Sequence, residues 1–232
     1  MRAIALLFLL FAVPVWAGEP IRIAVAANFK PALEKITAPF LADSGITVTY
    51  SSASTGALAT QIQHGAPYDI FFAADEETPQ KILALKGHEQ DQVFCYARGS
   101  LVMTGGDGKL ASLAQPQFSL AIANPATAPY GRAAMEVLAR PEFSAGESRK
   151  LVRGNSVAQA YQFWESGAVD LALLPRALVL TGGTPIPSQW HKSLEQHAIV
   201  LKQNASVAAF LQWLRSDAVR ALITAAGYDP CP

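Results

Sequence analysis

Short apolar runs alternate with amphipathic segments in the first half of the chain. The runs at residues 21–26, 46–50 and 69–74 are rich in β-branched or aromatic residues, which is typical of strands. A helical pattern follows each run, and the first of these patterns has Pro31 in its first turn and Gly45 beyond its end. This alternation predicts a mostly parallel sheet that is covered by helices.

The second half of the chain repeats the alternation. The predicted strands are residues 100–103, 120–123, 170–174 and 199–201, and the predicted helices begin near 130 and 155 and then cover 207–215 and 218–226. We therefore expect an α/β protein with two lobes. Residues 18–97 and 182–232 are expected to form lobe 1, and residues 98–181 lobe 2, with the final helices returning to lobe 1.

Residues 1–17 have the pattern of a signal peptide and not of a fold segment. Arg2 is followed by the apolar run 3–13, and the small residue Ala17 ends the segment. The apolar run is too short to span a membrane, which takes about 20 residues. We expect cleavage after about Ala17 and a soluble, exported protein in the periplasm.

The composition excludes several classes of protein. The 232 residues include 18 Lys+Arg and 18 Asp+Glu, so the net charge is zero, and 51% of the residues are hydrophobic. Nucleic-acid-binding proteins carry a basic excess, and disordered chains have high net charge and few apolar residues. A compact, nearly neutral globule without a polybasic surface is therefore predicted.

The cysteines and histidines suggest a disulfide more than a metal site. Cys95 and Cys231 can pair in an oxidising compartment, and the sequence alone leaves open whether they do. The chain has no C-x-x-C motif, and its histidines lack the helical spacing of metal ligands. These histidines, which are expected at the surface, are His64, His88, His191 and His197.

Four predicted helix starts contain small or polar residues, and the first three follow a predicted strand. These starts are Ala27–Asn28, Ser54–Gly56, Pro129–Gly131 and Asn155–Val157. A helix N-terminus presents unpaired N–H groups and about half a positive charge, so it stabilises an anion without a cationic side chain. Each start alone is an ordinary N-cap. Only the set, at the carboxyl ends of strands, points to a small anionic ligand.

The sequence contains no complete catalytic motif of the nucleophile-elbow or phosphate-loop kind. Residues 154–158 come within one residue of a G-x-S-x-G nucleophile elbow with Ser156 as nucleophile, but the last glycine is missing and no strand is evident before it. Gly108–Lys109 imitates the end of a phosphate loop, yet Leu110 cannot supply the hydroxyl. Asp75–Glu77 begins a predicted helix, where acidic residues are favoured anyway. The chain is not expected to be an enzyme, and a secreted α/β hydrolase using Ser156 is the alternative from a different class.

Together these segments resemble the periplasmic molybdate-binding proteins of ABC transporters, which are type II substrate-binding proteins. The resemblance covers nearly the whole chain after residue 17. The segments that carry it are 24–29, 54–62, 65–75, 124–131 and 155–161, and the long match over 65–75 is the most specific. The resemblance implies the periplasmic-binding-protein fold, in which two α/β lobes are joined by hinge strands and close over one oxyanion.

The resemblance also implies a set of ligand-binding residues. In lobe 1 these are Asn28, with Ala27 contributing backbone beside it, and Thr55, preceded by Ser54. In lobe 2 they are Tyr130, through its hydroxyl or its backbone, and the backbone N–H of Val157, with Ser156 beside it. Many family members have a tyrosine in the strand near Leu174, where this chain has Pro175, so Tyr130 is a candidate to replace it.

The expected ligand is molybdate or tungstate, bound without a cofactor and without direct metal ligation by the protein. The expected partner is the membrane permease of an ABC importer, and the protein is expected to be a monomer. The alternative within the same fold is a binding protein for sulfate, phosphate or an organic anion.

Overall fold

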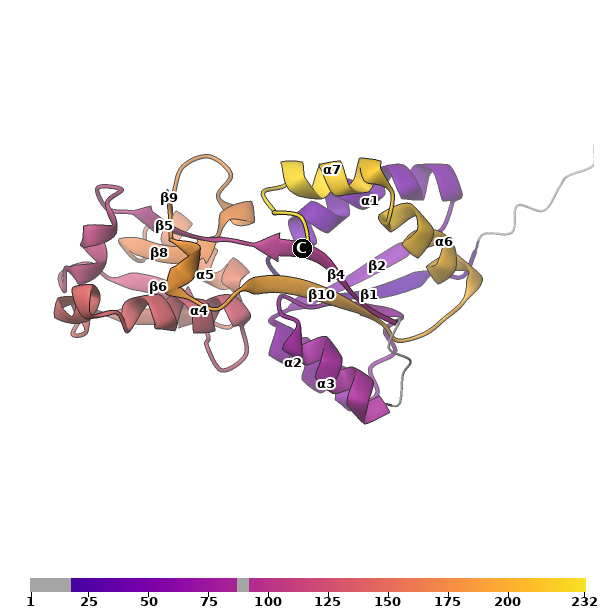
Figure 1. Ribbon diagram of the computed structural model, residues 1–232, viewed down its shortest axis with the longest axis horizontal. Helices are drawn as coiled ribbons and strands as arrows, with labels where there is room; N and C mark the ends of the chain where they lie inside the picture. The colour runs from indigo at the N-terminus through magenta and orange to yellow at the C-terminus, as the bar shows by residue number, and fades with distance from the viewer. Residues whose placement is uncertain (1–17, 87–91) are drawn as a thin grey trace, which may run out of the picture.

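The computed structural model describes residues 18–86 and 92–232, which form two α/β lobes linked by two passages of the chain (Figure 1). The predicted signal peptide, residues 1–17, and His88 lie outside the described residues. Within the part of the chain that is described, no helix is long and apolar enough to cross a membrane.

The first lobe is built on a five-stranded sheet with the order β2-β1-β3-β10-β4. Its strands are β1 (Ile21–Ala26), β2 (Val48–Ala53), β3 (Ile70–Phe72), β4 (Val93–Gly99) and β10 (Leu194–Val200). β1 is parallel to β2 and β3, whereas β10 is antiparallel to both of its neighbours. β2 continues beyond its predicted end at Tyr50 through Ser51 and Ser52, because an edge strand is only half-buried and tolerates polar residues.

Helices cover both faces of this first sheet (Figure 1). The helices are α1 (Lys30–Ser44), α6 (Ala205–Leu214) and α7 (Asp217–Ala225) on one face, and α2 (Thr55–Gln63) and α3 (Glu77–Lys86) on the other. Ile23 of β1 belongs to the buried cluster under α1 and α6, whereas its neighbour Ala24 belongs to the cluster under α2 and α3. Successive strand residues point to opposite faces, so both faces of β1 are apolar.

The second lobe has a five-stranded sheet with the order β7-β6-β8-β5-β9. Its strands are β5 (Leu101–Gly105), β6 (Leu120–Ala123), β7 (Leu151–Gly154), β8 (Leu171–Pro175) and β9 (Thr184–Pro185). The helices α4 (Pro129–Leu138) and α5 (Val157–Glu165) pack on opposite faces of it. Short 3₁₀ helices connect the rest: η2 (Leu110–Ala114), η3 (Pro141–Gly146), η4 (Arg176–Leu178) and η5 (Ser188–Trp190).

The chain passes between the two sheets at Ser100, which separates β4 from β5, and again between β9 and β10. The second passage comes later than residue 181, because Thr184 of β9 still pairs with Met103 of β5. Gly182 and Gly183 have φ values of 93° and 83°, a conformation that glycine adopts readily, and they form the turn that leads into β9. The chain therefore leaves the second sheet only after Pro185.

Three strands, β4, β7 and β9, were not predicted from the sequence. β4 carries Tyr96 and Arg98 and has no clear apolar alternation, and β7 is a four-residue edge strand. β7 ends at Gly154, two residues before Ser156. The expectation that no strand precedes Ser156 is therefore wrong, because a short edge strand needs little apolar sequence.

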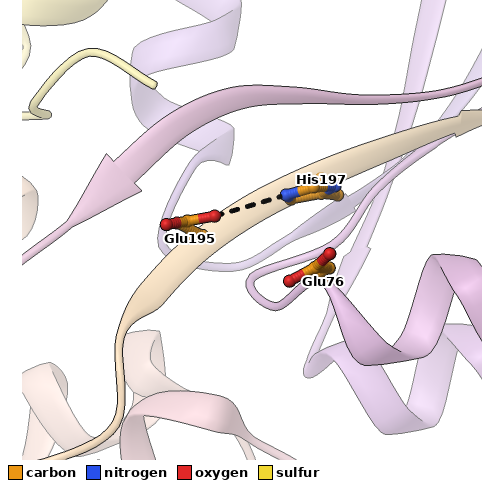
Figure 2. Close-up of side chains that lie close together, drawn as sticks. All are labelled: Glu76, Glu195 and His197. Carbon is orange, nitrogen blue, oxygen red and sulfur yellow. Dashed lines mark ion pairs between the residues drawn. The ribbon is translucent and has the colours of Figure 1, made fainter. Parts of the chain in front are cut away.

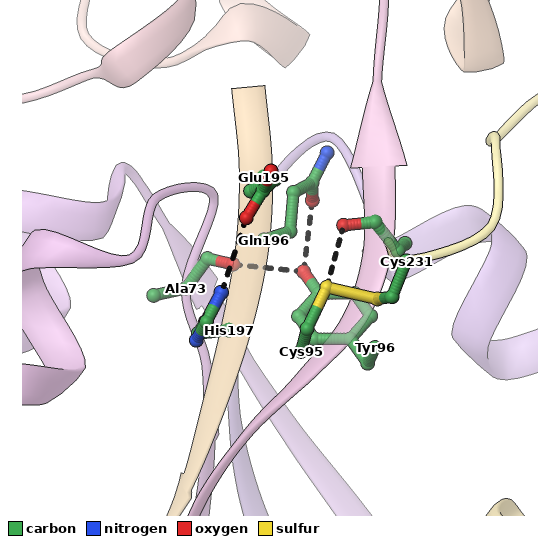
Figure 3. The surroundings of a disulfide bond; sticks show 8 residues. Ala73, Cys95, Tyr96, Glu195, Gln196, His197 and Cys231 are labelled. Carbon is green, nitrogen blue, oxygen red and sulfur yellow. Dashed lines mark hydrogen bonds and ion pairs between the residues drawn. A yellow bond between two sulfur atoms is a disulfide. The ribbon is translucent and has the colours of Figure 1, made fainter. Parts of the chain in front are cut away.

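Cys95 of β4 and Cys231 form a disulfide with a Cα–Cα distance of 6.0 Å (Figure 3). The possible pairing of the two cysteines is thus present in the structure. The bond fixes the C-terminal tail against β4, where Arg98 and Asp229 also exchange two backbone hydrogen bonds of 2.9 and 2.8 Å.

Candidate functional site

The predicted site residues lie at or just before helix starts. Ser54 is the N-cap of α2, and Ser156 is the N-cap of α5. Tyr130 lies in the first turn of α4, which begins at Pro129. Asn28 lies in the turn between β1 and α1, and Phe29 is the N-cap of α1. The first N–H groups of these helices need partners, and anions are one class of partner.

Most of these residues are buried although several are polar. The exposed fractions of Asn28, Thr55 and Tyr130 are 2%, 1% and 2%. Ala27, Ser54 and Val157 are also buried, while Ser156 is half-buried. Buried polar groups are almost always hydrogen-bonded, so this part of the molecule requires specific partners for each of them.

The two lobes meet at these residues. Ala27 of the first lobe packs in one buried cluster with Tyr130 and Val157 of the second. The start of α2 contacts the turn before α4 directly, since the N–H of Gly56 donates to the carbonyl oxygen of Thr127 at 2.8 Å. The lobes are therefore closed on each other where the sequence predicted a ligand.

The Thr55 hydroxyl is oriented by the backbone of the first lobe. Its Oγ1 accepts a hydrogen bond from the N–H of Ala74 at 3.0 Å. Ala74 belongs to the same buried cluster as Ala27 and Tyr130. A hydroxyl that accepts one bond keeps its proton for a second partner, so Thr55 can act as a neutral donor.

Asn28 and Tyr130 are joined by a buried hydrogen-bond network that sequence reasoning did not predict. Its centre is Gln196 of β10, whose exposed fraction is 0%. Asn28 Nδ2 donates to Gln196 Oε1 at 2.8 Å, and Gln196 Nε2 donates to the Tyr130 hydroxyl at 3.0 Å. Figure 3 shows the Tyr96 hydroxyl between Gln196 and the carbonyl of Ala73, at 2.8 and 2.9 Å.

Tyr228, near the C-terminus, completes the network. Its hydroxyl donates to the backbone carbonyl of Asn28 at 2.8 Å and accepts from Asn28 Nδ2 at 3.2 Å. Both protons of the Asn28 amide are therefore used inside the network, which leaves the backbone N–H of Asn28 as its group for a ligand. We call Asn28, Tyr96, Tyr130, Gln196 and Tyr228 the hinge network.

The hinge network is electrically neutral over the physiological range. Burial raises the pKa of Tyr130, Tyr96 and Tyr228 above the ordinary tyrosine value. Each hydroxyl therefore keeps its proton and remains a hydrogen-bond donor. The sequence signal for this network is the polar triplet Glu195–His197 inside a strand that is otherwise apolar.

Polar contacts at the rim also hold the lobes together. Arg132 of α4 forms an ion pair with Asp75 of the first lobe at 2.7 Å, and Arg176 bonds to Asp229 and to the carbonyl of Gly227 at 3.4 and 3.1 Å. Asp75 and Arg132 line a groove of about 390 Å³ at the lobe junction. These contacts lie outside the hinge network and are partly exposed to solvent.

His197 differs from the sequence expectation for the histidines. His64 is exposed as expected, but the His197 side chain is only 13% exposed, because it lies within β10 of the first sheet. Figure 2 shows it beside Glu195, at 3.8 Å, with Glu76 on the loop before α3. The ligand atoms of these three residues lie within 4.8 Å of one another, so they could hold a cation. Neither ring nitrogen of His197 has a hydrogen-bond partner among the described residues, and the spacing of the three side chains does not by itself assign a metal.

Ser156 is used as a helix cap. Its Oγ accepts a hydrogen bond from the N–H of Gln159 at 3.4 Å, the usual arrangement of an N-cap serine. This position at the start of α5 gives the hydroxyl a structural role and leaves the adjacent Val157 N–H at the helix terminus.

Comparison with known proteins gives a consistent result. Residues 21–229 match the sequence profile of the family of bacterial extracellular solute-binding proteins. The chain is 37% identical over 224 residues to the molybdate-binding protein ModA of Azotobacter vinelandii, covering 90% of this chain and 89% of that protein. It is 35% identical over 229 residues to ModA of Rhodobacter capsulatus, covering 94% and 90%.

Solved structures show the same fold. The periplasmic molybdate-binding protein of Azotobacter vinelandii superimposes with a TM-score of 0.82 at 31% identity, covering 91% of this chain and 100% of that one. The sulfate-binding protein SubI of Mycobacterium tuberculosis gives a TM-score of 0.73 at 14% identity, covering 92% of this chain and 87% of that one. The second likeness shows the fold alone.

Proposed function

The chain belongs to the family of bacterial extracellular solute-binding proteins, and we propose from this membership that it captures molybdate, and tungstate with it, for an ABC importer. It is a transport component and not an enzyme. One observation carries the proposal: the closed junction that unites Ala27, Tyr130 and Val157 lies in a chain with 37% identity to a molybdate-binding protein.

The mechanism of capture rests on neutral donors. Thr55 offers a hydroxyl proton, and the starts of α2, α4 and α5 offer backbone N–H groups. Their combined dipoles favour a dianion, and replacement of water by fixed donors avoids an unpaired buried charge. No cofactor takes part, because the molybdenum is bound as part of its own oxyanion.

The individual ligand contacts are part of the proposal. In lobe 1, we assign the backbone N–H of Asn28 and the hydroxyls of Ser54 and Thr55. Ala27 lies beside them, but its own N–H already donates to the Ala53 carbonyl at 3.0 Å. In lobe 2, the ligand meets the N–H groups at the starts of α4 and α5. These groups belong to Tyr130, Ser156 and Val157. The Tyr130 hydroxyl reaches the hinge network instead, which favours the backbone as its ligand-binding group.

Lobe closure would select among oxyanions by size. Donors from two lobes that close to fixed contacts, such as the 2.8 Å bond between Gly56 and Thr127, leave a shell of fixed dimensions. A tetrahedral anion that is too small cannot reach all donors together. We further propose that the predicted signal peptide directs export of the protein and that the protein acts as a monomer. Its closed form would then dock on a membrane permease.

Titration of the purified chain with sodium molybdate, tungstate, sulfate and phosphate by isothermal calorimetry tests this function. We expect tight binding of the first two anions alone. Binding of sulfate or phosphate in preference would assign the fold to another oxyanion. Absence of binding by all four, together with ester hydrolysis that is lost in Ser156→Ala, would replace the proposal with the hydrolase alternative.

A further inference from the structure

We propose that Gln196 is a positioning residue for oxyanion capture, which orients the Asn28 turn of the first lobe and Tyr130 of the second through one carboxamide group. The inference rests on the proposed function and adds a residue that does not itself touch the ligand. Gln196 lies on β10, the strand by which the chain re-enters the first sheet after leaving the second.

One end of the Gln196 carboxamide is a hydrogen-bond acceptor and the other end is a donor. Its Oε1 can only accept, so Asn28 must present Nδ2 to it, at 2.8 Å. Its Nε2 can only donate, so the Tyr130 hydroxyl must accept from it, at 3.0 Å. One amide therefore fixes the orientation of a side chain from each lobe.

The backbone of Asn28 is fixed by the same arrangement. Its side chain is held by Gln196 and Tyr228, and its carbonyl accepts from Tyr228 at 2.8 Å. The peptide planes on both sides of the one that carries the Asn28 N–H are fixed as well, because the Ala27 N–H donates to the Ala53 carbonyl at 3.0 Å and the Phe29 N–H donates to the Ala26 carbonyl at 2.9 Å. The backbone N–H of Asn28 is thus held in one direction, which is the preorganisation that an anion shell of neutral donors requires.

Gly99 of β4 provides an independent observation that this geometry is tightly constrained. A Cβ atom at Gly99 would lie 1.8 Å from the Tyr130 hydroxyl and 2.6 Å from Gln196 Nε2. The Gln196–Tyr130 pair therefore packs directly against the backbone of the strand that leaves the first sheet. The Gln196–Tyr130 contact between the lobes therefore involves both segments that link the two sheets, because Gly99 ends β4 and Gln196 lies in β10.

The first test compares Gln196→Leu and Gln196→Glu with the wild-type chain by calorimetric titration with sodium molybdate. The leucine variant keeps most of the volume and removes both hydrogen-bonding ends, and we expect affinity to fall roughly 10-fold or more. An ionised glutamate can accept from Asn28 but cannot donate to Tyr130. At about pH 8 we expect Gln196→Glu to bind as weakly as Gln196→Leu.

Lower pH provides a rescue that a merely structural role would not show. At about pH 5.5 the buried carboxyl group of Gln196→Glu takes up a proton, because burial raises its pKa, and it regains both an acceptor and a donor. Its affinity relative to wild type at the same pH should recover to within about threefold, while Gln196→Leu stays weak. The wild-type comparison accounts for other groups that titrate or carry charge around β10. These are Asp75, Glu76, Tyr96, Tyr130, Arg176, Glu195, His197, Tyr228 and Asp229.

Two further variants keep the test specific. Thr37→Val removes another buried hydroxyl of the first lobe, one that bonds to the Leu33 carbonyl within α1, and should lower stability without changing affinity. In a double-mutant cycle, Gln196→Leu should weaken binding much less in a Tyr130→Phe background, because the two residues act together.

The inference would be overturned if wild type, Gln196→Leu and Gln196→Glu bound molybdate with equal affinity at both pH values. It would also be overturned if the effects of Gln196→Leu and Tyr130→Phe were fully independent in the double-mutant cycle. Equal affinity losses in Gln196→Leu and Thr37→Val would overturn it as well. If the wild-type chain itself binds neither molybdate nor tungstate, the proposed function fails instead. The two failures are therefore distinguishable in the same set of titrations.

Discussion

At the scale of single residues, the proposed site is built from groups that carry no charge. Thr55, Asn28 and Tyr130 are all nearly inaccessible to water, and each has a defined partner in the closed structure. The zero net charge of the chain therefore excludes a large polyanion as ligand without excluding a small oxyanion.

Thr55→Val tests the role of the hydroxyl. Valine has nearly the same shape, but it removes the acceptor for the Ala74 N–H and the proton that is proposed to reach the anion. We expect molybdate affinity to fall by about 1–3 kcal/mol. Thr60→Val on the same helix is the matched control, because its hydroxyl is exposed and bonds only to the Gly56 carbonyl. Equal affinities of both variants would remove Thr55 from the site.

The buried tyrosines predict an alkaline limit of stability. Their pKa values are raised in the folded state by burial, so the folded chain holds these protons more tightly than the unfolded chain, whose tyrosines titrate near pH 10. Their contribution to stability is complete below about pH 10 and is lost as the pH rises above it.

Urea unfolding between about pH 8 and 11 measures this loss, and Tyr228→Phe should reduce its slope by up to about 1.4 kcal/mol per pH unit. Molybdate affinity should change little between about pH 7 and 9, because the tyrosines of the hinge network stay protonated there. An unchanged slope in Tyr228→Phe would show that this tyrosine titrates normally in the folded chain.

The residue scale also shows what the sequence could not predict. The helix starts that contain Thr55 and Val157 are predicted from local patterns, because a helix start is visible in a few adjacent residues, and the family resemblance then implies these two residues as ligand contacts. Gln196 is not, since its partners Asn28 and Tyr130 are 168 and 66 positions away. The choice between the hydroxyl and the backbone of Tyr130 likewise depends on where the ring ends, which only the fold determines.

At the scale of secondary-structure elements, local signals determine most of the lobes. Gly45 ends α1 in the left-handed conformation, with φ 67°, as its position after the apolar pattern predicts. β4 and β9 are missed because their pairing, and not their own sequence, makes them strands. β9 has only two residues, follows the turn at Gly182–Gly183 and pairs with β5.

Substitution of Gly56, in the first turn of α2, is expected to weaken binding without lowering the stability of the fold. A Cβ atom there would lie 3.1 Å from both Cα and O of Thr127, so Gly56→Ala should hinder closure of the lobes while favouring α2 by up to about 1 kcal/mol. We expect weaker molybdate binding, by roughly threefold or more, with an unchanged or higher melting temperature without ligand. Gln63→Ala, at the exposed end of α2, should change neither affinity nor closure. Unchanged affinity in Gly56→Ala would mean that the Thr127 turn moves aside without cost.

At the scale of the whole molecule, contacts distant in sequence join the lobes. The tail at residues 227–231 contacts Arg176 of the second lobe and is attached to β4 by the disulfide. The tail thus connects the second lobe to one of the two passages of the chain. Long-range contacts of this kind explain why composition and periodicity predict two lobes but not how they are held together.

The disulfide predicts a large effect on stability and a small one on binding. Cys95 and Cys231 are separated by 136 positions, and a loop of that size gives an entropic stabilisation of up to about 5 kcal/mol. The double variant Cys95→Ser with Cys231→Ser should therefore unfold at much lower urea concentration, and proteolysis should reach the tail sooner. Its molybdate affinity should stay within about threefold of wild type. Among the described residues, the hydrogen bonds between the hinge network and the tail involve Tyr228, which the pairing of Arg98 with Asp229 still holds. Loss of binding in a double variant that remains folded would show instead that the disulfide itself positions Tyr228 and, through it, the Asn28 turn.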